Sequence, residues 1–286
     1  MRLSSLIAHC AMLSAATAIP LGTSSIDTSH SYSPPSGELV TRADKPILRI
    51  MPLGASITLG IGDTPKGNES GYRKPLRDEF RWRGYTVNMV GCKQTGVMKD
   101  RQHEGHPGAL TTELIGFAKC QINLRPNVVL INAGTNDAKQ ARNRGGLPWV
   151  EASYDRMKDV IDYLYANSDG VTVILSTLLP QSDVAGNENV KIINEGYRRL
   201  VNDLKAQGCK IQLAEMNDGF INVSELVDGT HPKHETYPKM AAVWAHALTK
   251  ALDKGEVRHV IQLPNPGPFP DDGPITNPAL PKYPPA

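Results

Sequence analysis

Five short apolar runs constrain the fold of this 286-residue chain more than any other feature. Each run is nearly continuous in apolar character, which is typical of strands covered on both faces of a parallel sheet. The runs are Ile47–Met51, Tyr85–Val90, Asn127–Asn132, Val171–Leu175 and Lys210–Leu213. They predict a parallel sheet of five strands.

Apolar residues in the stretches around these runs recur three and four positions apart, which indicates amphipathic helices. The four sets run from Tyr72 to Phe80, Val150 to Leu164, Val190 to Leu204 and Met240 to Ala251. Alternation of strands and helices predicts a three-layer α/β/α sandwich of the flavodoxin-like type, with right-handed crossovers. In such sheets ligands bind at the carboxyl ends of the strands.

The chain divides into four segments by composition. Residues 1–18 have the pattern of a secretory signal peptide, with Arg2, a short apolar stretch and small residues before the cleavage point. Residues 19–45 are rich in Ser, Thr and Pro and predict a flexible lead-in. Residues 46–262 form one domain, and 263–286 form a proline-rich tail. We expect a secreted, extracellular protein; the alternative is a cytosolic protein with a disordered apolar start.

The charge balance indicates which partners to expect. Thirty-one basic residues against 29 acidic ones give a net charge of +2, which argues against a nucleic-acid surface. No stretch is long and apolar enough to span a membrane. We expect a monomer, with glycosylation sequons at Asn68 and Asn222.

Three cysteines, Cys92, Cys120 and Cys209, follow the signal peptide, which itself contains Cys10. An odd number allows at most one bridge and leaves one thiol free. Cys92 with Cys120 is the candidate pair, and three reduced, buried cysteines are the alternative. The spacings do not indicate a structural metal, and we expect no cofactor.

Asp228-Gly-Thr-His231-Pro places an acid and a histidine three residues apart in a compact turn. A histidine with an unperturbed pKa of ~6.5 suits the role of general base near neutrality. A neighbouring carboxylate can fix its tautomer and support the imidazolium. The structural alternative is a turn that Asp-Gly begins and His-Pro closes.

Ser56, in Pro52-Leu-Gly-Ala-Ser-Ile-Thr58, lies where the first run is expected to turn into a helix. There its hydroxyl is near the positive end of a helix dipole. Gly91 and Asn136 follow the second and third runs. The amides of Ser56 and Gly91 and the side chain of Asn136 could donate to an oxyanion. Alternatively, Ser56 and Asn136 cap helices and Gly91 ends a strand.

In this order, the segments at Ser56, Gly91, Asn136 and Asp228–His231 resemble the conserved blocks of SGNH (GDSL-type) serine hydrolases over nearly the whole domain. The resemblance implies Ser56 as nucleophile, Ser56, Gly91 and Asn136 as oxyanion donors, His231 as base and Asp228 as its orienting acid. One departure is that the first block in that family usually reads Gly-Asp-Ser, whereas Ala55 occupies the Asp position here. The departure raises the question of what holds the nucleophile turn.

Three further segments are similar to carbohydrate esterase family 3, which includes acetylxylan esterases. They are Gly71-Tyr-Arg73, His103-Glu-Gly-His-Pro-Gly108 and Tyr237-Pro-Lys-Met-Ala241. We expect Arg73, His103, Glu104 and His106 to line the cleft or hold its loop. A metal site at His103, Glu104 and His106 is the less favoured alternative, because no further ligand is evident.

The sequence therefore predicts a secreted serine esterase that removes acetyl groups from plant cell-wall polysaccharide, with acetylxylan as the main candidate. An aromatic content of 6% favours a short acyl group over a long one. The alternatives in the same class are a short-chain arylesterase or lipase and a deacetylase of another polysaccharide. A catalytically silent carbohydrate-binding protein is the alternative from another class, and Ala55 keeps it open.

Overall fold

The computed structural model describes residues 45–62, 69–263 and 273–285. The predicted signal peptide, which contains Cys10, lies outside the described residues. So do Asn68 and the predicted lead-in, of which only Lys45 is described. The predictions made for them are therefore not addressed by the structure.

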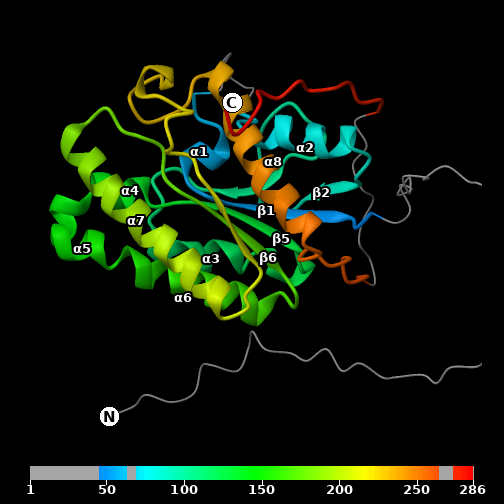
Figure 1. The fold of residues 1–286 in the computed structure, drawn as a ribbon, viewed down its shortest axis with the longest axis horizontal. Helices are drawn as coiled ribbons and strands as arrows, with labels where there is room; N and C mark the ends of the chain where they lie inside the picture. The colour runs from blue at the N-terminus through cyan, green and yellow to red at the C-terminus, as the bar shows by residue number, and fades with distance from the viewer. Residues whose placement is uncertain (1–44, 63–68, 264–272, 286) are drawn as a thin grey trace, which may run out of the picture.

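A mostly parallel sheet forms the middle layer of the molecule (Figure 1). Its order is β3-β4-β1-β5-β6-β7, and β2 also pairs with β1. The strands are β1 Leu48–Gly54, β2 Val87–Met89, β3 Lys93–Gln94, β4 Gln102–Gly105, β5 Val128–Asn132, β6 Thr172–Ser176 and β7 Ile211–Ala214.

Two short strands share the same edge of β1. β2 pairs with Leu48–Ile50 at the start of β1, whereas β4 pairs with Leu53 and Gly54 at its end. The parallel sheet therefore has five positions, as predicted, although seven strands occupy the sheet. β3 adds a short antiparallel pair to β4. β4 was not predicted because Gln102-His-Glu-Gly105 contains no apolar run.

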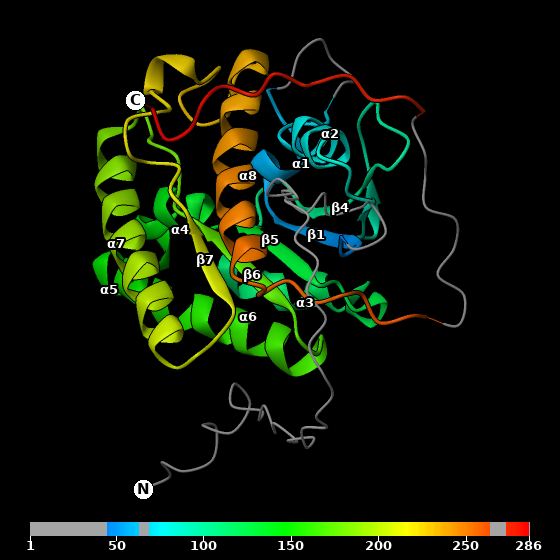
Figure 2. The same cartoon turned by 45° about the vertical axis from the view of Figure 1, so that its right-hand side comes forward.

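Helices cover both faces of the sheet. They are α1 Ser56–Leu59, α2 Arg73–Trp82, α3 Leu114–Ala118, α4 Thr135–Lys139, α5 Leu147–Glu151, α6 Ser153–Asn167, α7 Val184–Ala206 and α8 Tyr237–Asp253. α2 and α8 lie on one face, and α3, α6 and α7 lie on the other (Figures 1 and 2). This arrangement confirms the predicted three-layer sandwich.

Alternation along the strands divides the core into two layers. In β5, Val129 and Ile131 pack with the cluster that includes α6 and α7, while Val128 and Leu130 pack with α2 and α8. All four side chains are fully buried. Because successive side chains of a strand point to opposite faces, one apolar run contributes to both layers.

The predicted long helices are present. The set from Val150 to Leu164 is divided at Ala152, however, between α5 and α6. α1, α3 and α4 have only four or five residues each, too few to show a helical period, so the apolar spacing did not predict them. A helix after Ser56 was expected from its place at the end of a strand.

Cys92 and Cys120 form a disulfide with a Cα–Cα distance of 6.2 Å, which confirms the candidate pair. No cysteine among the described residues is free, so the expectation of one unpaired thiol is wrong.

The end of the proline-rich tail, residues 273–285, lies against the domain rather than extending from it (Figure 2). Tyr283 donates a hydrogen bond of 2.7 Å to Asp218 and packs near the ring of Phe220. Arg81 donates to the Gly273 carbonyl at 2.8 Å. The sequence predicted an extended tail, whereas residues 273–285 are anchored to the domain at both ends.

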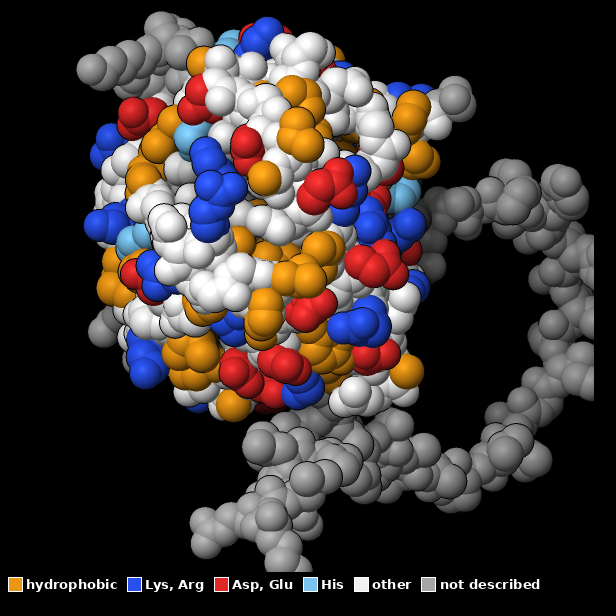
Figure 3. Space-filling model, turned by 90° about the vertical axis from the view of Figure 1, so that its left-hand side faces the viewer, with side chains coloured by type: hydrophobic (Ala, Val, Ile, Leu, Met, Phe, Trp, Pro, Cys, Tyr) orange, Lys and Arg blue, Asp and Glu red, His pale blue; other side chains and the backbone are white. Residues whose placement is uncertain are grey.

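Basic, acidic and apolar side chains are interspersed on the face shown in Figure 3, and neither sign of charge dominates it. Among the described residues, no helix combines the length and apolarity that crossing a bilayer requires.

Candidate active site

Ser56 lies at the junction of β1 and α1, at the carboxyl edge of the sheet. The preceding residues allow close packing there. A Cβ on Gly54 would overlap the Asn132 carbonyl at the end of β5 and the Thr58 hydroxyl. Glycine therefore lets the turn carrying Ser56 lie directly against the neighbouring strand.

His231 and Asp228 meet Ser56 across 175 residues of sequence. The Nε2 atom of His231 lies 2.8 Å from the Ser56 hydroxyl, and its Nδ1 atom lies 2.7 Å from Asp228 Oδ2. The other Asp228 oxygen accepts from the backbone amides of Thr230 and His231 at 3.0 and 2.9 Å. The predicted Ser56, His231 and Asp228 thus form one hydrogen-bonded chain.

The Asp228 carboxylate is set up to remain charged. Burial raises its pKa, but hydrogen bonds from the His231 backbone and ring and from Thr230 outweigh burial, so the net shift is downward. A charged carboxylate beside Nδ1 favours the tautomer that has its proton on Nδ1, which leaves Nε2 to accept the proton of Ser56.

The three predicted oxyanion donors follow the strands β1, β2 and β5 in the sequence. The backbone N–H groups of Ser56 and Gly91 donate to no other backbone group among the described residues. The Asn136 side chain donates one hydrogen to the Ala109 carbonyl at 2.9 Å, and its amide carries a second hydrogen. A Cβ on Gly91 would overlap the backbone of His103, so only glycine fits there.

The loop carrying Asp228 and His231 is held by residues that the sequence analysis did not identify. Thr230 accepts a hydrogen bond from Lys139 at 3.0 Å and donates one to Gln181 at 2.9 Å. The amide of Ser182 also donates to the Gly229 carbonyl at 3.0 Å. These contacts join segments distant in sequence, and their residue types have no diagnostic spacing.

Arg73 is fully buried and does not line a cleft. Its guanidinium donates to the carbonyls of Thr58 and Leu59 in α1 at 3.0 and 2.9 Å. It also donates to carbonyls of two adjoining loops, those of Glu69, Thr95 and Arg101. Arg73 therefore bonds the helix that carries Ser56 to two loops. These bonds hold the nucleophile turn, although Ala55 stands where the family usually has an acid.

His103 and Glu104 are also fully buried, so their predicted place along the cleft is wrong. His103 Nδ1 accepts from the Gly105 amide and its Nε2 lies 2.9 Å from the Thr95 hydroxyl. Both residues hold the loop, which was the other expectation. His106 is the partly exposed member of the group, with 18% of its side chain accessible.

His103 makes stability depend on pH. Burial, with the positive charges of Arg73, His106 and Lys93, lowers its pKa to about 2. The unfolded chain binds a proton below a pKa of ~6.5, but the folded protein does not. The contribution of His103 to the free energy of unfolding is therefore complete above pH 6.5 and decreases as the pH falls below that value.

The wild type should therefore lose stability relative to His103→Asn as the pH falls. We expect the difference between their free energies of unfolding to decrease by about 3 kcal/mol from pH 7 to pH 4, because one such group changes it by at most ~1.36 kcal/mol per pH unit. Urea unfolding at several pH values measures this difference. The matched control is His259→Asn, which replaces an exposed histidine. A difference between wild type and His103→Asn that is constant with pH contradicts the assignment.

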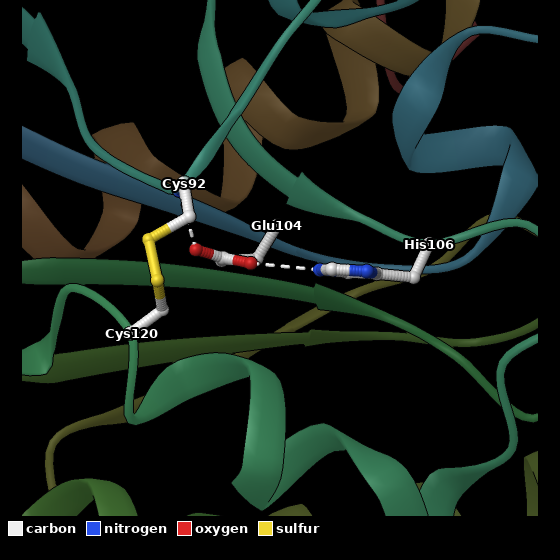
Figure 4. Close-up of a disulfide and its surroundings, with 4 residues drawn as sticks. All are labelled: Cys92, Glu104, His106 and Cys120. Carbon is white, nitrogen blue, oxygen red and sulfur yellow. Dashed lines mark hydrogen bonds and ion pairs between the residues drawn. A yellow bond between two sulfur atoms is a disulfide. The ribbon is translucent and has the colours of Figure 1, made fainter.

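The metal-ligating groups found close together in the described part of the chain are Cys92, Glu104 and Cys120. Their two sulfur atoms are bonded to each other, so in this state they are not available to a metal. Glu104 is instead bound by the Cys92 amide and by His106 Nε2, at 2.6 and 2.7 Å (Figure 4).

A cavity of about 590 Å³ lies between α2 and the C-terminal segment, away from the serine. Gly71, Tyr237 and Pro274 are among its lining residues, whereas Ser56 and His231 are not. The chain of Ser56, His231 and Asp228 lies nearer the surface, and 54% of the Asp228 side chain is accessible.

A serine that is hydrogen-bonded to a histidine and an acid at the carboxyl edge of a parallel sheet is an arrangement known from ester hydrolases. A sequence model of the GDSL-like lipase/acylhydrolase family matches residues 50–244. This range is more than half of the chain, which therefore belongs to the GDSL-like lipase/acylhydrolase family.

A multidomain esterase of Ruminococcus flavefaciens is 28% identical over 231 residues, which cover 70% of this chain and 28% of the relative. This chain thus matches little more than a quarter of that protein. Two solved structures share the fold. A family 3 carbohydrate esterase of Clostridium thermocellum has a TM-score of 0.61 at 22% identity, over 73% of this chain and 99% of that one. One from Talaromyces cellulolyticus has a TM-score of 0.58 at 21% identity, with the same coverage of both chains.

Proposed function

We propose that this protein is a secreted serine esterase that removes O-acetyl groups from plant cell-wall polysaccharide, acetylxylan above all. The observation that carries the proposal is the hydrogen-bonded series from Ser56 through His231 to Asp228. These hydrogen bonds form although Ala55 replaces the usual acid, which argues against a silent binding protein.

In the proposed reaction, Ser56 Oγ attacks the acetyl carbonyl carbon while His231 Nε2 takes the hydroxyl proton. The amides of Ser56 and Gly91 and the Asn136 side chain stabilise the oxyanion of the tetrahedral intermediate. The sugar oxygen leaves with the proton from His231, and the acetyl group remains on Ser56. Water that His231 activates then releases acetate and restores the serine.

Several features support a bulky polymeric substrate with a small acyl group. The triad lies near the surface, so a saccharide chain can reach it without entering a closed pocket. The two solved relatives described above are carbohydrate esterases by name. The low aromatic content offers no sign of a wide surface for long acyl chains. We propose a monomer that acts outside the cell on saccharide, without a nucleic-acid or membrane partner and without a cofactor, and that carries glycans at Asn68 and at the exposed Asn222.

An acetate-release panel tests the substrate class. Acetylated xylan, acetylated pectin and chitin oligomers are compared at matched acetyl concentration, together with p-nitrophenyl esters of two to eight acyl carbons. We expect the largest kcat/KM among the polymers for acetylated xylan, and a decline with acyl length among the small esters.

The same panel separates the alternatives. A preference for pectin or chitin oligomers overturns the xylan assignment and identifies a different polysaccharide deacetylase. A rate that rises with acyl length indicates a lipase, and activity on small esters alone indicates an arylesterase. Binding to xylan without acetate release, together with no labelling by a fluorophosphonate probe, indicates a silent binding protein.

A further inference from the structure

The contacts around Glu104 connect the disulfide to the backbone of the proposed oxyanion site. Glu104, in β4, is fully buried, and its Oε1 atom accepts a 2.6 Å hydrogen bond from the Cys92 amide. Cys92 directly follows Gly91, so this hydrogen bond fixes the peptide plane that joins the two residues. The Gly91 N–H group lies in the preceding peptide plane, which Gly91 shares with Val90, and the two planes meet at the Gly91 Cα atom. Fixing the later plane therefore limits the rotation about the Gly91 backbone bonds that orients this N–H group.

The second Glu104 oxygen is tied to the rest of the site. His106 Nε2 lies 2.7 Å from Oε2, and the His106 backbone amide donates to the Gly54 carbonyl at 3.0 Å. Gly54 lies two residues before the nucleophile. Figure 4 shows Glu104 between Cys92 and His106. Glu104 therefore joins the peptide after Gly91 to the loop that is bonded to Gly54.

Two links connect this region to α3 and the residues just after it. The His106 ring stacks on that of Phe117 in α3, with ring centroids 3.6 Å apart and an interplanar angle of 6°. Three residues later, Cys120 is bonded to Cys92. The Gly91–Cys92 segment is thus held to α3 by a covalent link and by a polar and aromatic one.

The backbone directly after Gly91 lies at the edge of the sheet. Cys92 and the two residues of β3 are exposed, and β3 pairs only with β4. Glycine has more rotational freedom than other residues, so an amide on Gly91 needs an external restraint to keep its direction. Catalysis by an oxyanion donor depends on such preorganisation.

We propose that Glu104 and the Cys92–Cys120 disulfide are positioning residues for the Gly91 amide, so that ester hydrolysis depends on the redox state of this bridge. The inference rests on the proposed function. Both cysteines are exposed, so a phosphine reductant can reach them. One phosphine and one water convert the disulfide into two thiols, and the phosphine becomes its oxide.

Kinetics of p-nitrophenyl acetate hydrolysis by the whole protein, before and after treatment with the phosphine, test this step. We expect reduction to lower kcat at least about tenfold, with KM changed less than about twofold, because the donor acts on the transition state. Loss of one oxyanion donor, ~10²–10³ in kcat, is the upper limit. Reoxidation should restore the rate.

The double variant Cys92→Ser/Cys120→Ser is the matched control for other disulfides. We expect it to have the kcat of the reduced wild type and no response to phosphine. A phosphine effect that persists in this variant arises elsewhere and overturns the inference, as does a reduced wild type with unchanged kcat.

Variants at Glu104 test the same link without redox chemistry, and they decide the question if the double variant does not fold. Glu104→Gln keeps an oxygen for the Cys92 amide, whereas Glu104→Ala removes it. We expect Glu104→Ala to lose kcat at constant KM and Glu104→Gln to regain most of it. Equal kcat in the two variants, measured below their Tm, contradicts the positioning role.

The outcome for oxidised wild type separates this inference from the proposed function. Absence of ester hydrolysis in the oxidised protein refutes the proposed function itself. Hydrolysis that is insensitive to reduction and to Glu104→Ala leaves the proposed function intact and refutes the positioning role alone.

Discussion

Replacing Ser56 with alanine is expected to reduce kcat for acetyl ester hydrolysis by ~10⁴–10⁶-fold. The substitution removes the hydroxyl that lies 2.8 Å from His231 Nε2, and no acyl-enzyme can form without it. The donors at Gly91 and Asn136 remain, so some acceleration over water should persist. Initial rates with p-nitrophenyl acetate and acetylated xylan measure the loss, and thermal unfolding checks that the fold is retained.

The matched control is Ser224→Ala, which deletes an exposed hydroxyl that is not part of the triad. It must be made in a bacterial host, because Ser224 belongs to the Asn222 sequon. We expect wild-type kcat in this variant and labelling by a fluorophosphonate probe, and neither in Ser56→Ala. Turnover at the wild-type rate in pure Ser56→Ala refutes Ser56 as nucleophile and the proposed esterase with it.

The parts of the fold that were predictable are those whose burial is expressed as an apolar pattern. β5 and α7 are examples, since nearly every residue facing the core is apolar. β4 is the counterexample. His103 and Glu104 are buried there because hydrogen bonds satisfy them, and a pattern based on hydrophobicity cannot show that.

The same distinction applies to the site. Ser56, Gly91 and Asn136 were predictable because parallel strands bring their carboxyl ends to one edge. Asp228 and His231 were predictable from their local spacing. The contacts of Thr230 with Lys139 and Gln181 join residues 91 and 49 positions apart, and single polar residues at such separations carry no signal.

The sequence left two roles open for Arg73, lining the cleft or holding its loop. A buried guanidinium with five carbonyl partners differs from a substrate-binding arginine only in its surroundings. The partners belong to Thr58 and Leu59 of α1 and to Glu69, Thr95 and Arg101 of the adjoining loops. The arginine thus joins the nucleophile turn to the loop that precedes β4.

Replacement of Arg73 with methionine is therefore expected to lower the free energy of unfolding by about 3–5 kcal/mol. It leaves several buried carbonyls without a donor, at ~1–3 kcal/mol for each unsatisfied group, and these costs are not additive. At ~2–4 °C per kcal/mol for a domain of this size, Tm should fall by more than about 6 °C. Urea and thermal unfolding measure both quantities.

Two variants make the result specific to the guanidinium. Arg142→Met removes an exposed arginine and should change stability by less than about 0.5 kcal/mol. Arg73→Lys keeps the charge but lacks the planar fork, so we expect a loss between those of the other two variants. Because Thr58 and Leu59 end the helix that carries Ser56, kcat of the folded Arg73→Lys protein should also fall. An Arg73→Met protein as stable as Arg142→Met would show that the nucleophile turn is held by other contacts.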